Sequence, residues 1–166
     1  KGIIINKDIS KAIYWLDKAA SKGDETAMFY LGEIYDQVED YQDICKAVYW
    51  YRKAAEAGDS DAQYNLAICY EHGDGVEKDF SKAVYWWKKA AANESFEAMR
   101  ALAICHFNGW GVECSIDLAN YWLRKVATLQ KGGLTMSHIL KEYRFVETFT
   151  IEQFGKTYNN SKLIMK

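Results

Sequence analysis

Histidine and cysteine are the residue types of this chain best suited to metal binding or nucleophilic catalysis, and both are few. The three histidines are His72, His106 and His138, and no two of them have the spacing of a zinc motif such as HExxH. A nucleophilic cysteine needs a neighbouring base and an oxyanion site, and nothing in the sequence nominates either. We therefore expect no metal, no cofactor and no catalytic residue.

The four cysteines are better explained by packing than by chemistry. Cys69 and Cys105 occupy equivalent positions one repeat apart, beside small residues, where a thiol packs as a small apolar group. Neighbouring helix axes about 8–10 Å apart leave equivalent cysteines too distant for a disulfide, whereas a Cys105–Cys114 bridge across one loop stays open. Reduced thiols are favoured, which slightly favours an intracellular location. Export stays open, because the chain does not begin with Met and a leader could have been removed.

Two glycine-rich segments have the composition of a phosphate-binding loop. They are Gly73-Asp74-Gly75-Val76 and Gly109-Trp110-Gly111-Val112. A phosphate loop also needs a preceding strand and a Gly-Lys-Ser/Thr ending, and both are missing here. Because the two segments recur in phase, we interpret them as turns. Trp110 stands outside the repeated pattern, and it either folds back over the last unit or offers an exposed contact, for example to a glycan.

Composition points to helices with short connections. The chain has no proline, 27% charged residues and 49% hydrophobic residues, which suits a folded helical domain of this length. A net charge of −2 gives no reason to expect a nucleic-acid partner. No apolar run approaches the roughly 20 residues that cross a bilayer, so we expect no direct membrane insertion.

The elements that position these residues come from an internal repeat of about 36 residues. Its clearest marker begins Lys11-Ala12-Ile13-Tyr14-Trp15, recurs at Lys46–Trp50 and Lys82–Trp86, and returns degraded at Leu118–Trp122. Lys18-Ala19-Ala20 and a pattern beginning Ala27-xxx-Leu31-Gly32 repeat in the same register. Three markers in one register predict a solenoid.

Each unit is predicted to hold two helices. The first carries Ala, Leu, a small residue and an aromatic on one face, as at Ala27, Leu31, Gly32 and Tyr35. The second carries a stripe such as Ala47, Trp50, Tyr51 and Ala54. The small residue lets the partner helix approach closely, and His106 takes the aromatic position as a core substitute. We interpret the tyrosine and tryptophan stripes mostly as core, with Trp15, Trp50, Trp86 and Trp122 packing the repeats together.

These markers resemble the Sel-one-like repeat family, a relative of the tetratricopeptide repeats. Its pattern is close to A-x-x-x-L-G-x-x-Y-x-x-G-x-G-V-x-x-D-x-x-K-A-x-x-W-Y-x-K-A-A-x-x-G, which residues 62–91 match almost throughout. The resemblance covers about residues 2–128. It departs at Asp36–Tyr41, where the glycine loop is replaced by one a residue shorter, and at Leu118 and Val126. The family implies an all-α, right-handed α/α solenoid (superhelix), here of about three and a half repeats with a C-terminal helical cap.

The predicted organisation follows from this register. Residues 1–128 form the repeat array, with a lone second helix at 8–21 and units at about 24–57, 59–92 and 95–128. The start within a unit favours a fragment of a longer array. Residues 129–166, which carry a net positive charge where 1–128 are net negative, are predicted to form a capping helix and a tail.

The family implies a non-catalytic scaffold or adaptor for another protein or peptide, bound on the concave face of the first helices. By analogy with tetratricopeptide arrays, the outward positions of that face are Phe29, Glu33, Asp36, Tyr64, Ile68, Glu71, His72, Arg100, Ile104, Phe107 and Asn108. Apolar members of this set suit a peptide or helix laid in a groove. Two alternatives stay open: a cell-wall or glycan-binding accessory or inhibitor protein, and a regulatory repeat segment of a larger multidomain protein.

Overall fold

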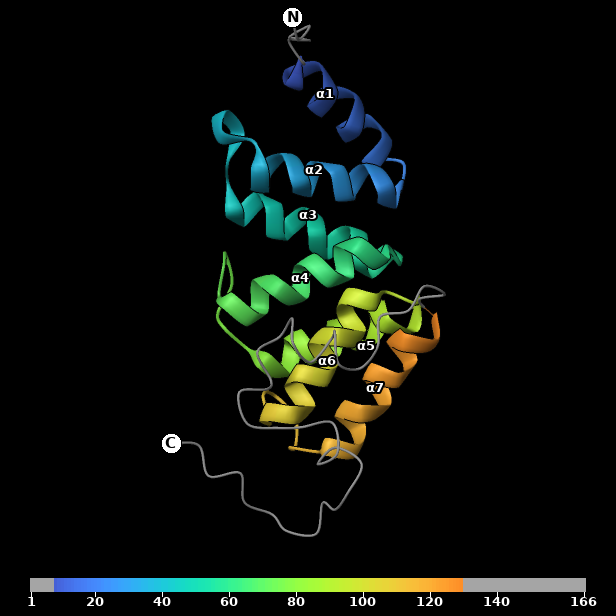
Figure 1. Ribbon diagram of the computed structural model, residues 1–166. Coiled ribbons are helices and arrows are strands. Elements are labelled where there is room, and N and C mark those ends of the chain that lie inside the picture. Colours follow the sequence, from blue (N-terminus) through green and yellow to red (C-terminus); the bar gives the residue numbers. More distant parts are fainter. Residues whose placement is uncertain (1–7, 130–166) are drawn as a thin grey trace, which may run out of the picture. The chain divides into compact units, whose positions relative to one another are not determined.

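A computed structural model of the chain describes residues 8–129, and within this range the structure is helical without strands (Figure 1). The elements in chain order are α1 (Ile9–Ala20), α2 (Glu25–Gln37), the short 3-10 helix η1 (Glu39–Tyr41), α3 (Ile44–Ala57), α4 (Ser60–His72), α5 (Phe80–Ala92), α6 (Phe96–Asn108) and α7 (Ile116–Leu129). The predicted all-α fold is confirmed. The capping helix and tail predicted for 129–166 lie, apart from Leu129, outside the described residues.

The helices pack in sequence order. Contacts join α1 to α2, α2 to α3, α3 to α4, α4 to α5 and α5 to α6, as expected of a stack in which each unit touches its neighbours. The chain divides into two compact units, Lys1–Trp122 and Leu123–Lys166, and α7 runs from the first into the second. Helices α1 to α6 belong to the first unit.

Short polar side chains begin the helices. An aspartate precedes each of α1 to α5, and its carboxylate accepts a hydrogen bond from a backbone N–H of the first turn; Ser95 does the same for α6. This satisfies a donor that the helix itself leaves unpaired. Left-handed glycines end α3, α4 and α6, at Gly58, Gly73 and Gly109. The glycine-rich segments 73–76 and 109–112, interpreted as turns, do begin where α4 and α6 end.

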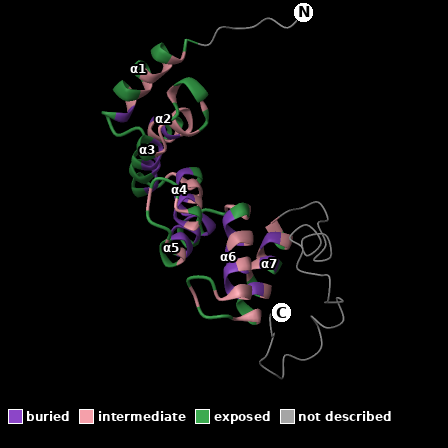
Figure 2. Cartoon of the chain, turned by 90° about the vertical axis from the view of Figure 1, so that its left-hand side faces the viewer, coloured by how far each residue is buried: buried purple, intermediate pink, exposed green. Residues whose placement is uncertain are grey.

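The core consists of the predicted stripes. The first-helix residues Ala62, Leu66 and Ala67 are fully buried, and so are Ala47 and Ala54 of the second helix α3. Figure 2 shows the same burial along α3 to α6, whereas α1 is mostly exposed or intermediate. The packing of Gly32 explains why a small residue is required in the first helix. A β-carbon there would lie 2.5 Å from Cδ1 of Tyr51, so only glycine admits that ring.

One repeated hydrogen bond closes the turn inside each unit, whatever its length. The carbonyl oxygen of Tyr70 accepts from the backbone N–H of Asp79 at 2.8 Å, and that of Tyr35 accepts from Asp43 at 2.8 Å. The turn between α2 and α3 is one residue shorter than the turn between α4 and α5, and it contains η1 instead of the two glycines. The sequence correctly predicted a different turn here, and the bond shows that both turns join the two helices at the same point.

The prediction for the aromatic stripes was partly wrong. Trp86 is 9% exposed, as expected of packing between repeats, but Trp15 is 63% exposed. Trp50 packs against the cluster of Ala20, Ala27 and Leu31 in the preceding helices. No described element precedes α1, so Trp15 has no such cluster to cover. The tyrosines one position before these tryptophans are also surface residues: Tyr14, Tyr49, Tyr85 and Tyr121 are each 52–53% exposed.

Candidate partner-binding face

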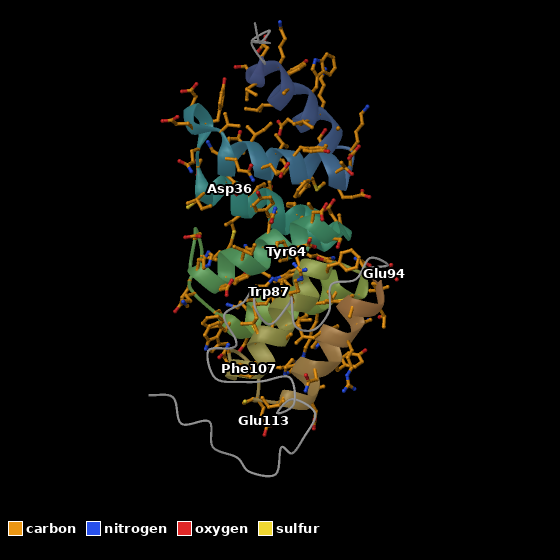
Figure 3. The ribbon with its side chains drawn as sticks, viewed as in Figure 1. Asp36, Tyr64, Trp87, Glu94, Phe107 and Glu113 are labelled. Atoms are coloured by element: carbon orange, nitrogen blue, oxygen red, sulfur yellow. The ribbon has the colours of Figure 1, made fainter. Side chains whose placement is uncertain are left out.

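The predicted groove residues lie on α2, α4 and α6 and repeat from one helix to the next. We call them the first-helix face: Phe29, Glu33 and Asp36 on α2; Tyr64, Ile68, Glu71 and His72 on α4; Arg100, Ile104, Phe107 and Asn108 on α6. Figure 3 labels one member from each helix, Asp36, Tyr64 and Phe107. All are partly buried except His72, which is exposed. They are thus held by their neighbours yet reach the surface.

Tyr51 of α3 fixes the α2 part of this face from below. Its ring lies 6.1 Å from that of Phe29, centroid to centroid, and its hydroxyl donates a hydrogen bond of 3.2 Å to Oδ2 of Asp36. Tyr51 is only 1% exposed. Burial raises the pKa of its hydroxyl well above the usual range, with the nearby Asp36 carboxylate adding to the effect, so Tyr51 stays a neutral donor. It therefore orients both a ring and a carboxylate of the face.

Negative charge gathers where α2 meets α4. The pKa of Glu33 is raised, first because the carboxyl is partly buried and then because Asp61, Asp36 and Asp59 lie close enough to repel its charge. The pKa of Asp59 is raised for related reasons, burial first. Carboxylates that repel one another therefore lie at this end of the face.

Apolar residues form the middle of the face, and buried thiols lie beside them in the same helices. Ile68 and Ile104 are partly exposed on α4 and α6, and the next residue in each helix, Cys69 or Cys105, is buried. Burial raises the pKa of both thiols to about 12, so they are protonated at neutral pH and unsuited to nucleophilic work.

All four cysteines are free thiols. The exposed Cys114 donates to the carbonyl oxygen of Phe107 at 3.1 Å.

The histidines have separate environments. His106 is 6% exposed, which confirms it as a core substitute, and burial lowers its pKa. His72 is exposed, and its ring nitrogens lie 3.8 Å from Glu71 Oε2 and 3.6 Å from Asp74 Oδ2. Over residues 8–129, no three His, Cys, Asp or Glu side chains gather as a metal site would require.

Trp110 combines the two roles that the sequence left open. It is 40% exposed, and its ring also packs against Phe80, with centroids 5.3 Å apart. Its loop neighbour Gly111 contacts the backbone of Phe80 and Ser81 so closely that no β-carbon would fit. The loop of the last unit is therefore fastened to the start of α5, and one side of the indole remains at the surface.

Two features of the surface were missed by sequence reasoning. Tyr51 was assigned to the core stripe, correctly, but its hydroxyl contact with Asp36 depends on which way a buried ring points. The sequence interpretation places the tyrosine stripes mostly in the core, whereas Tyr14, Tyr49, Tyr85 and Tyr121 are exposed. Their spacing could have shown this. Each lies one residue from a member of the buried stripe, not three or four residues from it, so it points to a different side of the helix.

The fold defines an all-helical repeat protein whose helix pairs and turn hydrogen bonds recur from unit to unit. A family model for the Sel1 repeat matches residues 1–24, 26–59, 60–95 and 96–130. The chain belongs to the Sel1 repeat family. Proteins of this family are generally scaffolds for protein–protein interaction and are typically non-catalytic.

Solved structures show the same fold. The protective antigen c5321 of uropathogenic Escherichia coli, which displays an SLR fold, is 34% identical with a TM-score of 0.71; the match covers 75% of this chain and 27% of that one. A Sel1 repeat protein from Oxalobacter formigenes is 31% identical with a TM-score of 0.67, covering 70% and 89%. Cysteine rich protein B of Helicobacter pylori shares the fold at 23% identity and a TM-score of 0.60, covering 80% and 96%. The chain thus spans about a quarter of the E. coli antigen.

No curated protein matched the sequence. Among the helices of residues 8–129, none is both long and apolar enough to pass through a membrane.

Proposed function

We propose that this chain is a non-catalytic scaffold and that its first-helix face holds an apolar segment of another protein carrying Lys or Arg. The observation that carries this is the pairing, on one repeated set of positions, of partly exposed apolar side chains with crowded carboxylates. Phe29, Ile68 and Ile104 supply apolar surface. Glu33 supplies a carboxylate that nearby negative charges disfavour. Binding of an apolar and cationic segment would remove apolar surface from water and would reduce the repulsion at the Glu33 carboxylate.

The thiols and the tyrosine hydroxyl near the face favour a structural role over a catalytic one. The thiols beneath the face are held protonated by burial, and Tyr51 is a neutral donor committed to Asp36. These are groups that stiffen a surface. A stiff, preformed surface loses little entropy on binding, which suits the holding of a flexible segment.

Selection from a library of short random peptides tests the proposal. We expect the selected peptides to combine large apolar residues with Lys or Arg. Tyr64→Ala should weaken a selected peptide about tenfold, since truncating an aromatic at the centre of an interface costs about 1–2 kcal/mol. Glu33→Lys should weaken it further, because it reverses the charge that the peptide meets. Calorimetric titration measures both.

Leu118→Ala is the matched control, because Leu118 is a 45% exposed apolar residue outside the first-helix face. It should leave affinity unchanged. Selected peptides that are acidic, or that bind Tyr64→Ala and Glu33→Lys as tightly as the parent chain, would refute the proposed face. Melting temperatures of all variants separate loss of binding from loss of folding.

A further inference from the structure

The second helices carry a repeated arrangement that the packing of the fold does not use. In each of α1, α3 and α5 an exposed tyrosine stands beside the in-phase tryptophan, edge to face, with ring centroids 5.1–5.2 Å apart. These are Tyr14, Tyr49 and Tyr85, and Tyr121 of α7 makes the same contact with Trp122. Each has the same exposure, 52–53%. A side chain needed only for the core would not be half in solvent at every repeat.

A lysine lies over each of the first three rings. The ammonium nitrogens of Lys18, Lys53 and Lys89 are 4.7, 5.9 and 5.1 Å from the ring centres of Tyr14, Tyr49 and Tyr85. Such cation–π contacts hold the lysine close to the ring while leaving its N–H groups able to donate. We call these four tyrosines and three lysines the tyrosine–lysine face. Because the repeats share one geometry, their members fall at corresponding places of successive units.

Other lysines on the same helices are already paired. Lys11, Lys46 and Lys82 form ion pairs of 2.9, 3.2 and 3.3 Å with Asp8, Asp43 and Asp79, the residues that begin each helix. The lysines of the tyrosine–lysine face instead lie over aromatic rings. Their charge therefore remains available to a partner.

Charge is also divided between the two kinds of helix. The second helices α1, α3 and α5 contain eight Lys and Arg against two Asp and Glu. The first helices α2, α4 and α6 contain six Asp and Glu against one Arg. A chain of net charge −2 thus presents a basic second-helix side. This division means that the two sides suit partners of opposite charge.

We propose that the tyrosine–lysine face is a second docking surface, and that its partner is an extended, carboxylate-rich segment of another protein. Lysine ammonium groups pair with carboxylates, tyrosine hydroxyls donate to them, and the exposed rings offer apolar area at low entropic cost. A protein segment fits better than a nucleic acid, because a chain of net charge −2 opposes a dense row of phosphates more strongly than it opposes carboxylates spaced along a peptide. The scaffold would then join a cationic segment on one face to an acidic segment on the other.

Fluorescence anisotropy with labelled oligoglutamate of about 20 residues tests this proposal. Binding should weaken as salt is added, because 0.1 M salt screens attraction between exposed charges beyond about 10 Å. We expect salt-sensitive, saturable binding. Lys53→Gln/Lys89→Gln should reduce it at least about tenfold and Tyr49→Ala/Tyr85→Ala several-fold. The matched control Lys46→Gln/Lys82→Gln removes the same charge from the same helices, but from lysines already paired, and should cause a much smaller loss.

Four results would overturn the proposal: no saturable binding, equal loss in the control variant, no loss in the tyrosine variant, or tighter binding of oligothymidylate of similar length, which would indicate a nucleic-acid surface. Tyr64→Ala should leave oligoglutamate binding intact. Failure here is therefore distinguishable from failure of the first-helix face.

Discussion

At the scale of single residues, the structure assigns most of its polar chemistry to positioning. Tyr51 shows this best, because one buried hydroxyl orients Asp36 while its ring supports Phe29. The sequence could place Tyr51 in the core from its register in the repeat. It could not predict the hydrogen bond, since the direction of a buried side chain depends on the helix packed against it.

Glu33 provides a prediction that depends on pH. Its pKa is raised in the folded chain, so between the unfolded and the folded pKa the folded state binds more protons than the unfolded state does, and stability is lost as pH rises through the folded pKa. Glu33→Gln removes this penalty and should have a higher melting temperature than the parent chain at pH 7. The difference should shrink as pH falls through the raised pKa of Glu33, because the native carboxyl then becomes protonated.

The exposed Glu97, on the first helix α6, gives the control for that change. Glu97→Gln should leave the melting temperature nearly unchanged at both pH values. A Glu33→Gln variant less stable than the parent at pH 7 would show that the carboxylate is stabilising where it lies.

At the scale of helices and turns, the sequence was most informative. Spacing of Ala, Leu and small residues predicted the two helices of each unit, and the repeated glycine segments predicted turns between them, because these signals are local. The exposure of Trp15 could not be predicted in this way. Its burial requires a neighbouring element, and the repeat pattern alone does not say whether one is present.

The turn glycines test the packing between units. Gly58 and Gly111 both have positive φ, but a β-carbon at Gly58 meets nothing within 4 Å, whereas one at Gly111 meets the backbone of Phe80 and Ser81. Gly58→Ala should therefore cost only the left-handed strain, about 1 kcal/mol. Gly111→Ala should cost about 1–3 kcal/mol more, since backbone must move to admit the methyl group. Urea unfolding compares the two.

Equal destabilisation of the Gly58→Ala and Gly111→Ala variants would contradict the close contact between the last loop and α5. The unchanged slope of the urea transition would confirm that the two substitutions act on the folded state.

The helices also differ in how firmly they are held. Ala20 is the one buried residue of α1, whereas α3 and α5 each bury a continuous stripe. Opening of α1 exposes little buried apolar area to water and therefore costs little free energy. We expect the amides of α1 to exchange with solvent hydrogen faster than those of α3 and α5. Mass spectrometry of deuterated fragments measures this, and exchange of α1 at the rate of α5 would contradict it.

At the scale of the molecule, the repeat register predicted the fold class and the family, because a period that persists through the chain constrains every unit at once. Partner choice is not constrained in the same way. It depends on exposed positions, which packing leaves free to vary. The division of charge between first and second helices is visible only when the helices are sorted by their place in the unit.

The central claim is that the first-helix face receives the partner segment, and amide chemical shifts test it most directly. A selected peptide titrated into isotopically labelled chain should shift resonances of α2, α4 and α6 at members of that face, including Tyr64, Ile68 and Ile104. Resonances near Tyr49 and Tyr85 should stay in place. Shifts confined to α1, α3 and α5, or the same shifts in the Tyr64→Ala variant, would contradict the account.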